Sequence, residues 1–147
     1  MMPFKKILIP TDGSENAKAA AIQGLELAKL IEAQVAVISV IDEDSGFAIR
    51  GFRRAAVEGY AYLEEEAKKA VDQIGQEAER IGLSVKKIIR KGAPANEIIM
   101  ASKDYDLIIM GTLGHTGLAH LLMGGVAEKV VRFASCPVLL IRTQIER

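Results

Sequence analysis

The chain has 147 residues, of which 50% are hydrophobic and 26% charged, and its 19 basic and 19 acidic side chains give a net charge of zero. This composition is typical of one soluble domain that can bury a core, and it argues against nucleic acid or an anionic membrane as the main partner. The apolar runs are shorter than the roughly 20 residues that span a bilayer, and the lone Cys136 excludes an internal disulfide.

We therefore expect a single domain over residues 1–147. The first residues contain neither the apolar core nor the small-residue cleavage site of a signal peptide, so we expect a cytoplasmic location.

The first half of the chain predicts two strands with a helix between them. Apolar runs predict strands at Phe4–Pro10 and Gln34–Ile41, and the second run is so uniformly apolar that both of its faces should be buried. The helical period favours a helix over Ala17–Ile31, for which Ser14 is a suitable N-cap.

An irregular segment at residues 42–56 interrupts this alternation. It begins with acidic residues and then mixes phenylalanines with arginines and glycines. Such interleaving can stack on nucleic-acid bases, but three arginines without a wider basic patch are a weak signal. A segment this long within a small domain is typical of a functional or mobile loop, and we favour a solvated insertion or a flap near the ligand.

The second half continues the alternation of helices and strands. The predicted elements are a helix at Val57–Ile81 ended by Gly82, a strand at Ser84–Arg90, a short helix from Pro94 through Ser102, a strand at Leu107–Met110, a helix at Val126–Arg132 and a strand at Pro137–Arg142. Strands that alternate with helices predict an α/β fold: a doubly wound parallel sheet with right-handed crossovers.

Two glycine clusters lie between the fourth strand and the last helix. Gly111 and Gly114 follow the strand, and the pair Gly124 and Gly125 precedes the helix. Glycine lets a ligand approach the backbone closely, and a helix N-terminus attracts anions. The pattern predicts a phosphate site, with a loop that merely needs tight turns as the alternative.

The spacing Gly111-x2-Gly114-x9-Gly124 resembles the signature G-x2-G-x9-G-(Ser/Thr) of the universal stress protein family, and Pro10–Ser14 resembles the opening loop of that family. The resemblance covers essentially the whole chain. It implies a Rossmann-like domain with a five-stranded parallel sheet of order 3-2-1-4-5 and, as in many members, ATP binding. The chain departs from the signature at Gly125, where a hydroxyl residue is expected, so a side-chain donor to phosphate is lost.

The implied strand order reverses between strands 1 and 4, and ligands of open α/β sheets bind at such a switch point. The loops after these two strands flank the same crevice. The predicted nucleotide-binding residues are Pro10, Thr11, Asp12, Gly13, Ser14, Val40, Ile41, Asp42, Met110, Gly111, Thr112, Gly114, His115, Gly124, Gly125 and Val126.

Asp12 ends the first strand and would repel phosphate unless a cation lay between them. It is therefore a candidate Mg²⁺ ligand, or else a brace for its own loop. Thr11 and Ser14 offer hydroxyl and N–H groups to the ligand, and His115 is either a phosphate donor or solvent-exposed.

The adenosine half of the ligand needs apolar cover. Val40 and Ile41 end the second strand, and the resemblance implies Val40 as the contact. Met110 would lie beneath the adenine or ribose. Asp42 would accept hydrogen bonds from ribose hydroxyls or remain solvated.

Other functions of the same fold class fit the sequence less well. A receiver domain would need an acidic cluster after strand 1 and an aspartate after strand 3, and a flavin carrier would need a loop rich in serine and threonine. No Walker lysine and no catalytic triad can be identified, so no catalytic residue is predicted. The resemblance implies a nucleotide-dependent switch or stress-response regulator that binds ATP with Mg²⁺. The alternatives are a scaffold without nucleotide and a slow ATPase that needs a partner.

The fifth strand predicts a homodimer. Its residues Val138, Leu139, Leu140 and Ile141 are apolar, and in the implied order they form a sheet edge, which is prone to pairing unless it is covered or charged. Family members resembling this chain commonly dimerise through that strand. The sequence identifies no other protein partner.

Overall fold

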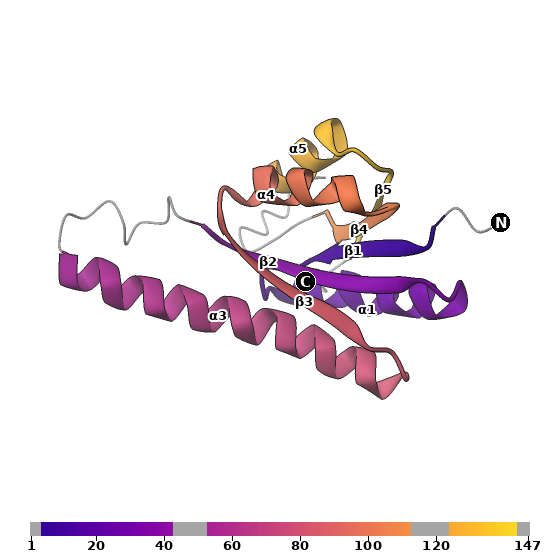
Figure 1. Ribbon diagram of the computed structural model, residues 1–147, viewed down its shortest axis with the longest axis horizontal. Helices are drawn as coiled ribbons and strands as arrows, with labels where there is room; N and C mark the ends of the chain where they lie inside the picture. The colour runs from indigo at the N-terminus through magenta and orange to yellow at the C-terminus, as the bar shows by residue number, and fades with distance from the viewer. Residues whose placement is uncertain (1–3, 43–52, 113–123, 144–147) are drawn as a thin grey trace.

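The protein consists of one parallel sheet between two layers of helices. The computed structural model describes residues 4–42, 53–112 and 124–143 (Figure 1). In chain order the elements are β1 (Lys6–Pro10), α1 (Glu15–Leu30), β2 (Gln34–Asp42), α3 (Arg53–Arg80), β3 (Val85–Gly92), α4 (Pro94–Ala101), the 3-10 helix η1 (Ser102–Asp104), β4 (Leu107–Gly111), α5 (Gly125–Phe133) and β5 (Val138–Ile141).

The sheet has the order β3-β2-β1-β4-β5, and every neighbouring pair is parallel. The predicted fold class and strand order are therefore confirmed. In β1 every residue after Lys6 is buried, and β4 is buried up to Gly111. Such continuous apolar runs are expected where helices cover both faces of a sheet.

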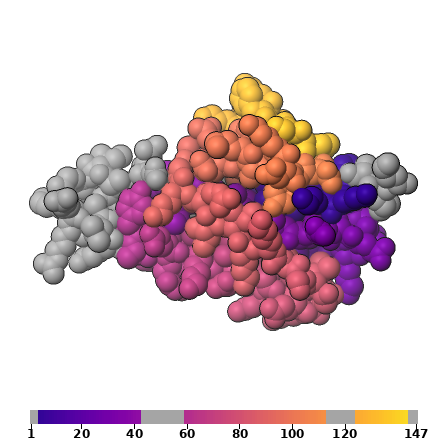
Figure 2. Space-filling view, viewed as in Figure 1, coloured from indigo at the N-terminus to yellow at the C-terminus, as the bar shows by residue number. Residues whose placement is uncertain are grey.

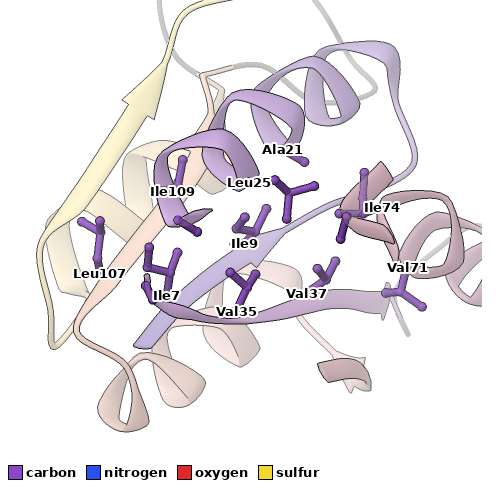
Figure 3. Close-up of a cluster of buried hydrophobic side chains, with 13 residues drawn as sticks. Ile7, Ile9, Ala21, Leu25, Val35, Val37, Val71, Ile74, Leu107 and Ile109 are labelled. Atoms are coloured by element: carbon purple, nitrogen blue, oxygen red, sulfur yellow. The ribbon is translucent and has the colours of Figure 1, made fainter. Parts of the chain in front are cut away.

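Successive residues of a strand point to opposite faces, so the sheet separates two apolar cores. Ile7 and Ile9 of β1 belong to the core beneath α1 and α3, together with Leu25 and Ile74 (Figure 3). Leu8, between them in the chain, belongs to the core beneath α4 and α5.

Gly24 brings α1 close to the sheet. A Cβ atom at this position would lie 3.1 Å from both Ile9 Cδ1 and Ile109 Cγ2, which is tighter than ordinary packing. The contact holds α1 on β1 and β4, the two strands between which the strand order reverses.

Most predicted elements are confirmed, with shifted boundaries. The main correction concerns the segment predicted to be irregular at residues 42–56: α3 begins at Arg53, so residues 53–56 are helical, and Asp42 is the last residue of β2. Residues 43–52 of that segment lie outside the described part of the chain. Gly82 follows α3 with φ +83°, as a C-terminal glycine should.

The strand β5 and the helix α5 lie at one rim of the molecule. Figure 1 shows β5 beyond β4, and Figure 2 shows α5 projecting from the surface in yellow. The opposite sheet edge is formed by β3, which runs beside β2.

Candidate functional site

The loop after β1 is held by short-range hydrogen bonds. Gly13 takes φ +84° and donates its N–H to Thr11 Oγ1 at 3.2 Å. Ser14 donates its N–H to Asp12 Oδ1 at 2.9 Å, and Thr11 donates to the carbonyl of Ile38 in β2 at 2.9 Å. Side chains that accept from the backbone two residues on are a common way to fix a tight turn. These three hydrogen bonds therefore fix the shape of the loop.

Ser14 starts α1, which confirms the predicted N-cap. Its Oγ accepts from the N–H of Ala17 at 3.1 Å, and its backbone is extended, as a cap requires. Glu15 is the first helical residue. The partial positive charge of the helix is thereby placed at the carboxyl edge of the sheet.

These bonds reduce the number of hydrogen-bond donors that the loop after β1 can present to a ligand. The N–H groups of Thr11, Gly13 and Ser14 already donate inside the protein, so phosphate would have to meet other donors of this loop, among them the hydroxyl groups of Thr11 and Ser14. One carboxylate oxygen of Asp12 braces the loop, as one of its two predicted roles required, while the side chain remains exposed to solvent.

The second loop is closed at its base. Gly111 pairs with Ile141 across β4 and β5, and the N–H of Thr112 donates to the carbonyl of Ile141 at 3.3 Å. Gly124 then donates its N–H to the carbonyl of Thr112 at 2.6 Å. The first and last glycines of the signature are thus brought together. Gly114 and His115 lie outside the described residues.

The start of α5 is open. Gly124 is its N-cap, with φ −76° and ψ 166°, and no side chain caps the helix. Gly125 is exposed and has no positive φ, and within the described part of the chain no atom lies within 4 Å of a Cβ built on it. The signature position that lacks its hydroxyl is the first residue of α5. Val126, also predicted to touch the ligand, is 39% exposed beside it.

The apolar residues of the predicted site divide between the two faces of the sheet. Val40 and Met110 belong to the same core, beneath α4 and α5. Ile41 points to the other face by strand alternation and is only 3% exposed, so it is a core residue rather than a surface for adenine. Asp42 is half-buried at the end of β2, and Pro10 is buried at the end of β1.

One contact near these loops could not be read from the sequence. Thr143, which follows β5, donates its hydroxyl to Asn16 Oδ1 in the first turn of α1 at 2.8 Å. Asn16 is 5% exposed. No pattern in the sequence signals a bond between residues this far apart, although Asn and Thr are common hydrogen-bonding partners.

Two hollows among the described residues lie away from the two loops. A cavity of about 550 Å³ lies at the amino ends of the strands, lined by Lys5, Lys6, Glu32, Asp106 and nearby apolar residues. Its charges are mixed, and Asp106 already accepts from the N–H groups of Lys5 and Lys6 at 2.9 Å. Parallel sheets bind ligands at their carboxyl edge, so we place the site with the two loops and not in this cavity.

Residues 4–42, 53–112 and 124–143 contain no group of three or more histidine, cysteine or acidic side chains arranged to hold a metal ion. Within the same residues no helix combines the length and apolarity needed to cross a membrane.

Cys136 is partly buried against the core beneath α4 and α5, as a space-filling cysteine would be. Burial, assisted by the negative charge of Asp106, raises the pKa of its thiol, and a hydrogen bond from the backbone of Ile108 acts in the opposite direction. A raised pKa lowers the fraction of reactive thiolate. The environment is therefore that of an inert cysteine.

Known proteins resemble this chain in both sequence and structure. Residues 3–142 match the sequence model described as "Universal stress protein family". Universal stress protein MJ0531 of Methanocaldococcus jannaschii is 39% identical over 143 residues, an alignment that covers 95% of this chain and 82% of the relative.

Solved structures share the fold over nearly the full length. The structure of protein MJ0577, of the same organism, has a TM-score of 0.84 at 36% identity and covers 99% of this chain and 100% of its own. A universal stress protein in complex with cAMP (TM-score 0.72, 19% identity, 97% and 100% coverage) shares the fold. So does the Archaeoglobus fulgidus protein in complex with dAMP (TM-score 0.62, 21% identity, 95% and 99% coverage).

Proposed function

This chain belongs to the universal stress protein family, and on that premise we propose that it binds ATP with Mg²⁺ and acts as a nucleotide-dependent switch or stress-response regulator. The observation that carries the proposal is the placement of two loops. The loop after β1 and the base of the glycine loop after β4 follow adjacent strands, at the point where the strand order reverses. Two family structures that hold adenine nucleotides, cAMP and dAMP, support the ligand class.

The phosphates would lie between the two loops. The hydroxyls of Thr11 and Ser14 face them from one side, and the N–H groups at the start of α5 and the positive ends of α1 and α5 add donors and favourable charge. Mg²⁺ would lie beside the exposed carboxylate of Asp12 and would keep most of its water ligands. On the adenosine side, Val40 and Met110 share one core and would provide the apolar contact.

A scaffold without nucleotide is the second candidate. It is favoured by Gly125, which has no hydroxyl, and by the loop after β1, in which the N–H groups of Thr11, Gly13 and Ser14 are occupied. A hydrogen bond to a charged group contributes about 1.5–3 kcal/mol, so one missing donor weakens binding without abolishing it. We therefore place nucleotide binding first. Slow ATP hydrolysis with a partner protein, and a cytoplasmic location, remain predictions.

We also propose a homodimer through β5. Leu139 is 39% exposed, and β5 is a sheet edge without a charged residue. The other edge, β3, carries Lys86, Lys87, Arg90 and Lys91. Charged edge strands resist pairing with another copy. Of the two sheet edges, β5 is therefore the one suited to pairing with a second copy of the chain. Pairing across a two-fold axis gives a closed assembly of two chains.

Mass spectrometry of freshly purified protein tests the ligand class without assuming its identity. We expect an adenine nucleotide to be released on denaturation in a stoichiometric or partial amount. Protein that is folded, free of nucleotide, and unable to take up ATP after dialysis would support the scaffold reading.

A further inference from the structure

The last residue of β5 and a residue just beyond it contact the start of the glycine loop and the first turn of α1. Ile141 accepts from the N–H of Thr112 at 3.3 Å, which fixes the start of the glycine loop. Two residues later, Thr143 donates to Asn16 Oδ1 at 2.8 Å, which fixes the first turn of α1. One short segment is therefore bonded to each side of the crevice.

Asn16 transmits this contact to the loop after β1. It lies two residues after the N-cap Ser14, whose Oγ accepts from Ala17 and whose N–H donates to Asp12. Asn16 is buried, so its side chain has little room to move when Thr143 is in place. A shift of Thr143 would thus move Asn16 and, through the first turn of α1, Ser14 and Asp12.

The same segment extends the strand through which the homodimer is proposed. The carbonyls of Pro137 and Ile141 accept from β4, at Ile108 and Thr112. Because backbone groups alternate along a parallel strand, the N–H and carbonyl groups of Val138 and Leu140 point away from β4, toward a second copy. Pairing on that side would restrain β5 and the residues that follow it.

We propose that the Thr143–Asn16 hydrogen bond couples nucleotide binding to dimerisation, an inference that rests on the proposed function. Pairing of β5 holds Thr143 in place, Thr143 holds Asn16, and the first turn of α1 is then fixed for phosphate. By thermodynamic linkage, each bound nucleotide strengthens the dimer by the same factor as dimerisation strengthens nucleotide binding at that site, and a two-fold dimer contains two such sites. The net value of one neutral hydrogen bond limits this factor to about two- to tenfold.

Sedimentation equilibrium with and without Mg-ATP measures this factor. For the wild type we expect the dissociation constant of the dimer to fall about four- to a hundredfold when ATP saturates both sites, because the factor for one site enters once for each chain. Thr143→Val keeps the branched shape and loses the donor, so ATP should leave its dimer unchanged. Thr143→Ser keeps the donor and should retain the wild-type factor.

A purely structural role gives a different result. In that case Thr143→Val would lower the melting temperature or weaken both equilibria, while ATP would still tighten its dimer by the wild-type factor, and the coupling would be overturned. It is equally overturned if the wild type binds ATP and dimerises but ATP leaves the dimer constant unchanged. A wild type that binds no ATP, or stays monomeric, instead contradicts the proposed function itself.

Discussion

The backbone N–H of Gly124 donates a 2.6 Å hydrogen bond to the carbonyl oxygen of Thr112. Thr112 directly follows β4, and Gly124 is the N-cap of α5. The bond therefore holds the two ends of the glycine loop together. The base of the proposed phosphate site is thereby held by a backbone hydrogen bond.

Gly125 offers the sharpest test of the phosphate contacts. Gly125→Ser should tighten ATP binding by up to about tenfold, because a serine hydroxyl can donate to the phosphate and tenfold corresponds to the lower end of the range of about 1.5–3 kcal/mol that such a bond contributes. The backbone at Gly125 has no positive φ, and none of the described residues approaches its Cβ position, so serine meets no clash with residues 4–42, 53–112 or 124–143. Isothermal titration calorimetry with Mg-ATP measures the change.

Gly125→Ala is the matched control, because it makes the same backbone change without a hydroxyl. We expect its affinity to equal that of the wild type. If serine and alanine have the same effect, or if serine weakens binding, the missing hydroxyl is not what limits affinity.

The C-terminus of α1 contains a strained residue. Glu32 takes φ +57° in the turn between Ile31 and Ala33, a conformation that suits glycine. Left-handed backbone costs a side-chain residue about 1–2 kcal/mol, and the greater freedom of glycine in the unfolded chain offsets about half of this. Glu32→Gly should therefore raise the free energy of unfolding by about 0.5–1 kcal/mol.

Gly82→Ala is the converse change at the end of α3, where φ is +83°. It should destabilise the protein by about 1 kcal/mol or more. Urea unfolding curves of both variants give the two values. A Glu32→Gly variant no more stable than the wild type would show that the side chain of Glu32 makes a compensating contact.

The thiol of Cys136 should react slowly. Burial and the charge of Asp106 raise its pKa, so at neutral pH less thiolate is present than in a free cysteine, and the rate should rise only as the pH increases toward the raised pKa. Alkylation by iodoacetamide, followed by mass spectrometry, should be slower than for the urea-unfolded chain at the same pH. Equal rates in the folded and unfolded protein would contradict this environment.

The homodimer can be tested with proline on two adjacent residues of β5. Leu140→Pro removes an N–H that points away from β4, so it should give a folded monomer. Leu139→Pro removes an N–H that points toward β4, so it should mainly lower the melting temperature. Light scattering should give a mass near twice 15.9 kDa for the wild type. A folded Leu140→Pro dimer would exclude pairing through this edge.

The sequence was sufficient to predict those parts of the fold that depend on local patterns. The apolar runs located the strands, and Ser14 and Gly82 correctly marked the start of one helix and the end of another. The start of α3 was predicted four residues late, at Val57 instead of Arg53. The first turn of α3 begins with two arginines and carries no apolar period. Nothing local therefore distinguished this turn from a loop.

The site was predictable only in outline. The glycine spacing located both loops, but the hydrogen bonds that occupy the N–H groups of Thr11 and Ser14 depend on the detailed turn geometry. Ile41 was predicted to contact the ligand because it ends β2, yet strand alternation turns it into the core. The Thr143–Asn16 bond depends on how β5 ends relative to α1, which only the folded chain determines.

Calorimetric titration of the wild-type protein with ATP in the presence of Mg²⁺ tests the central claim most directly. We predict one saturable site per chain, and loss of that site in Gly114→Val, where side-chain bulk replaces the open approach to phosphate, with the melting temperature close to that of the wild type. Absence of any binding heat at millimolar ATP, from protein shown to be folded and free of nucleotide, would contradict the claim.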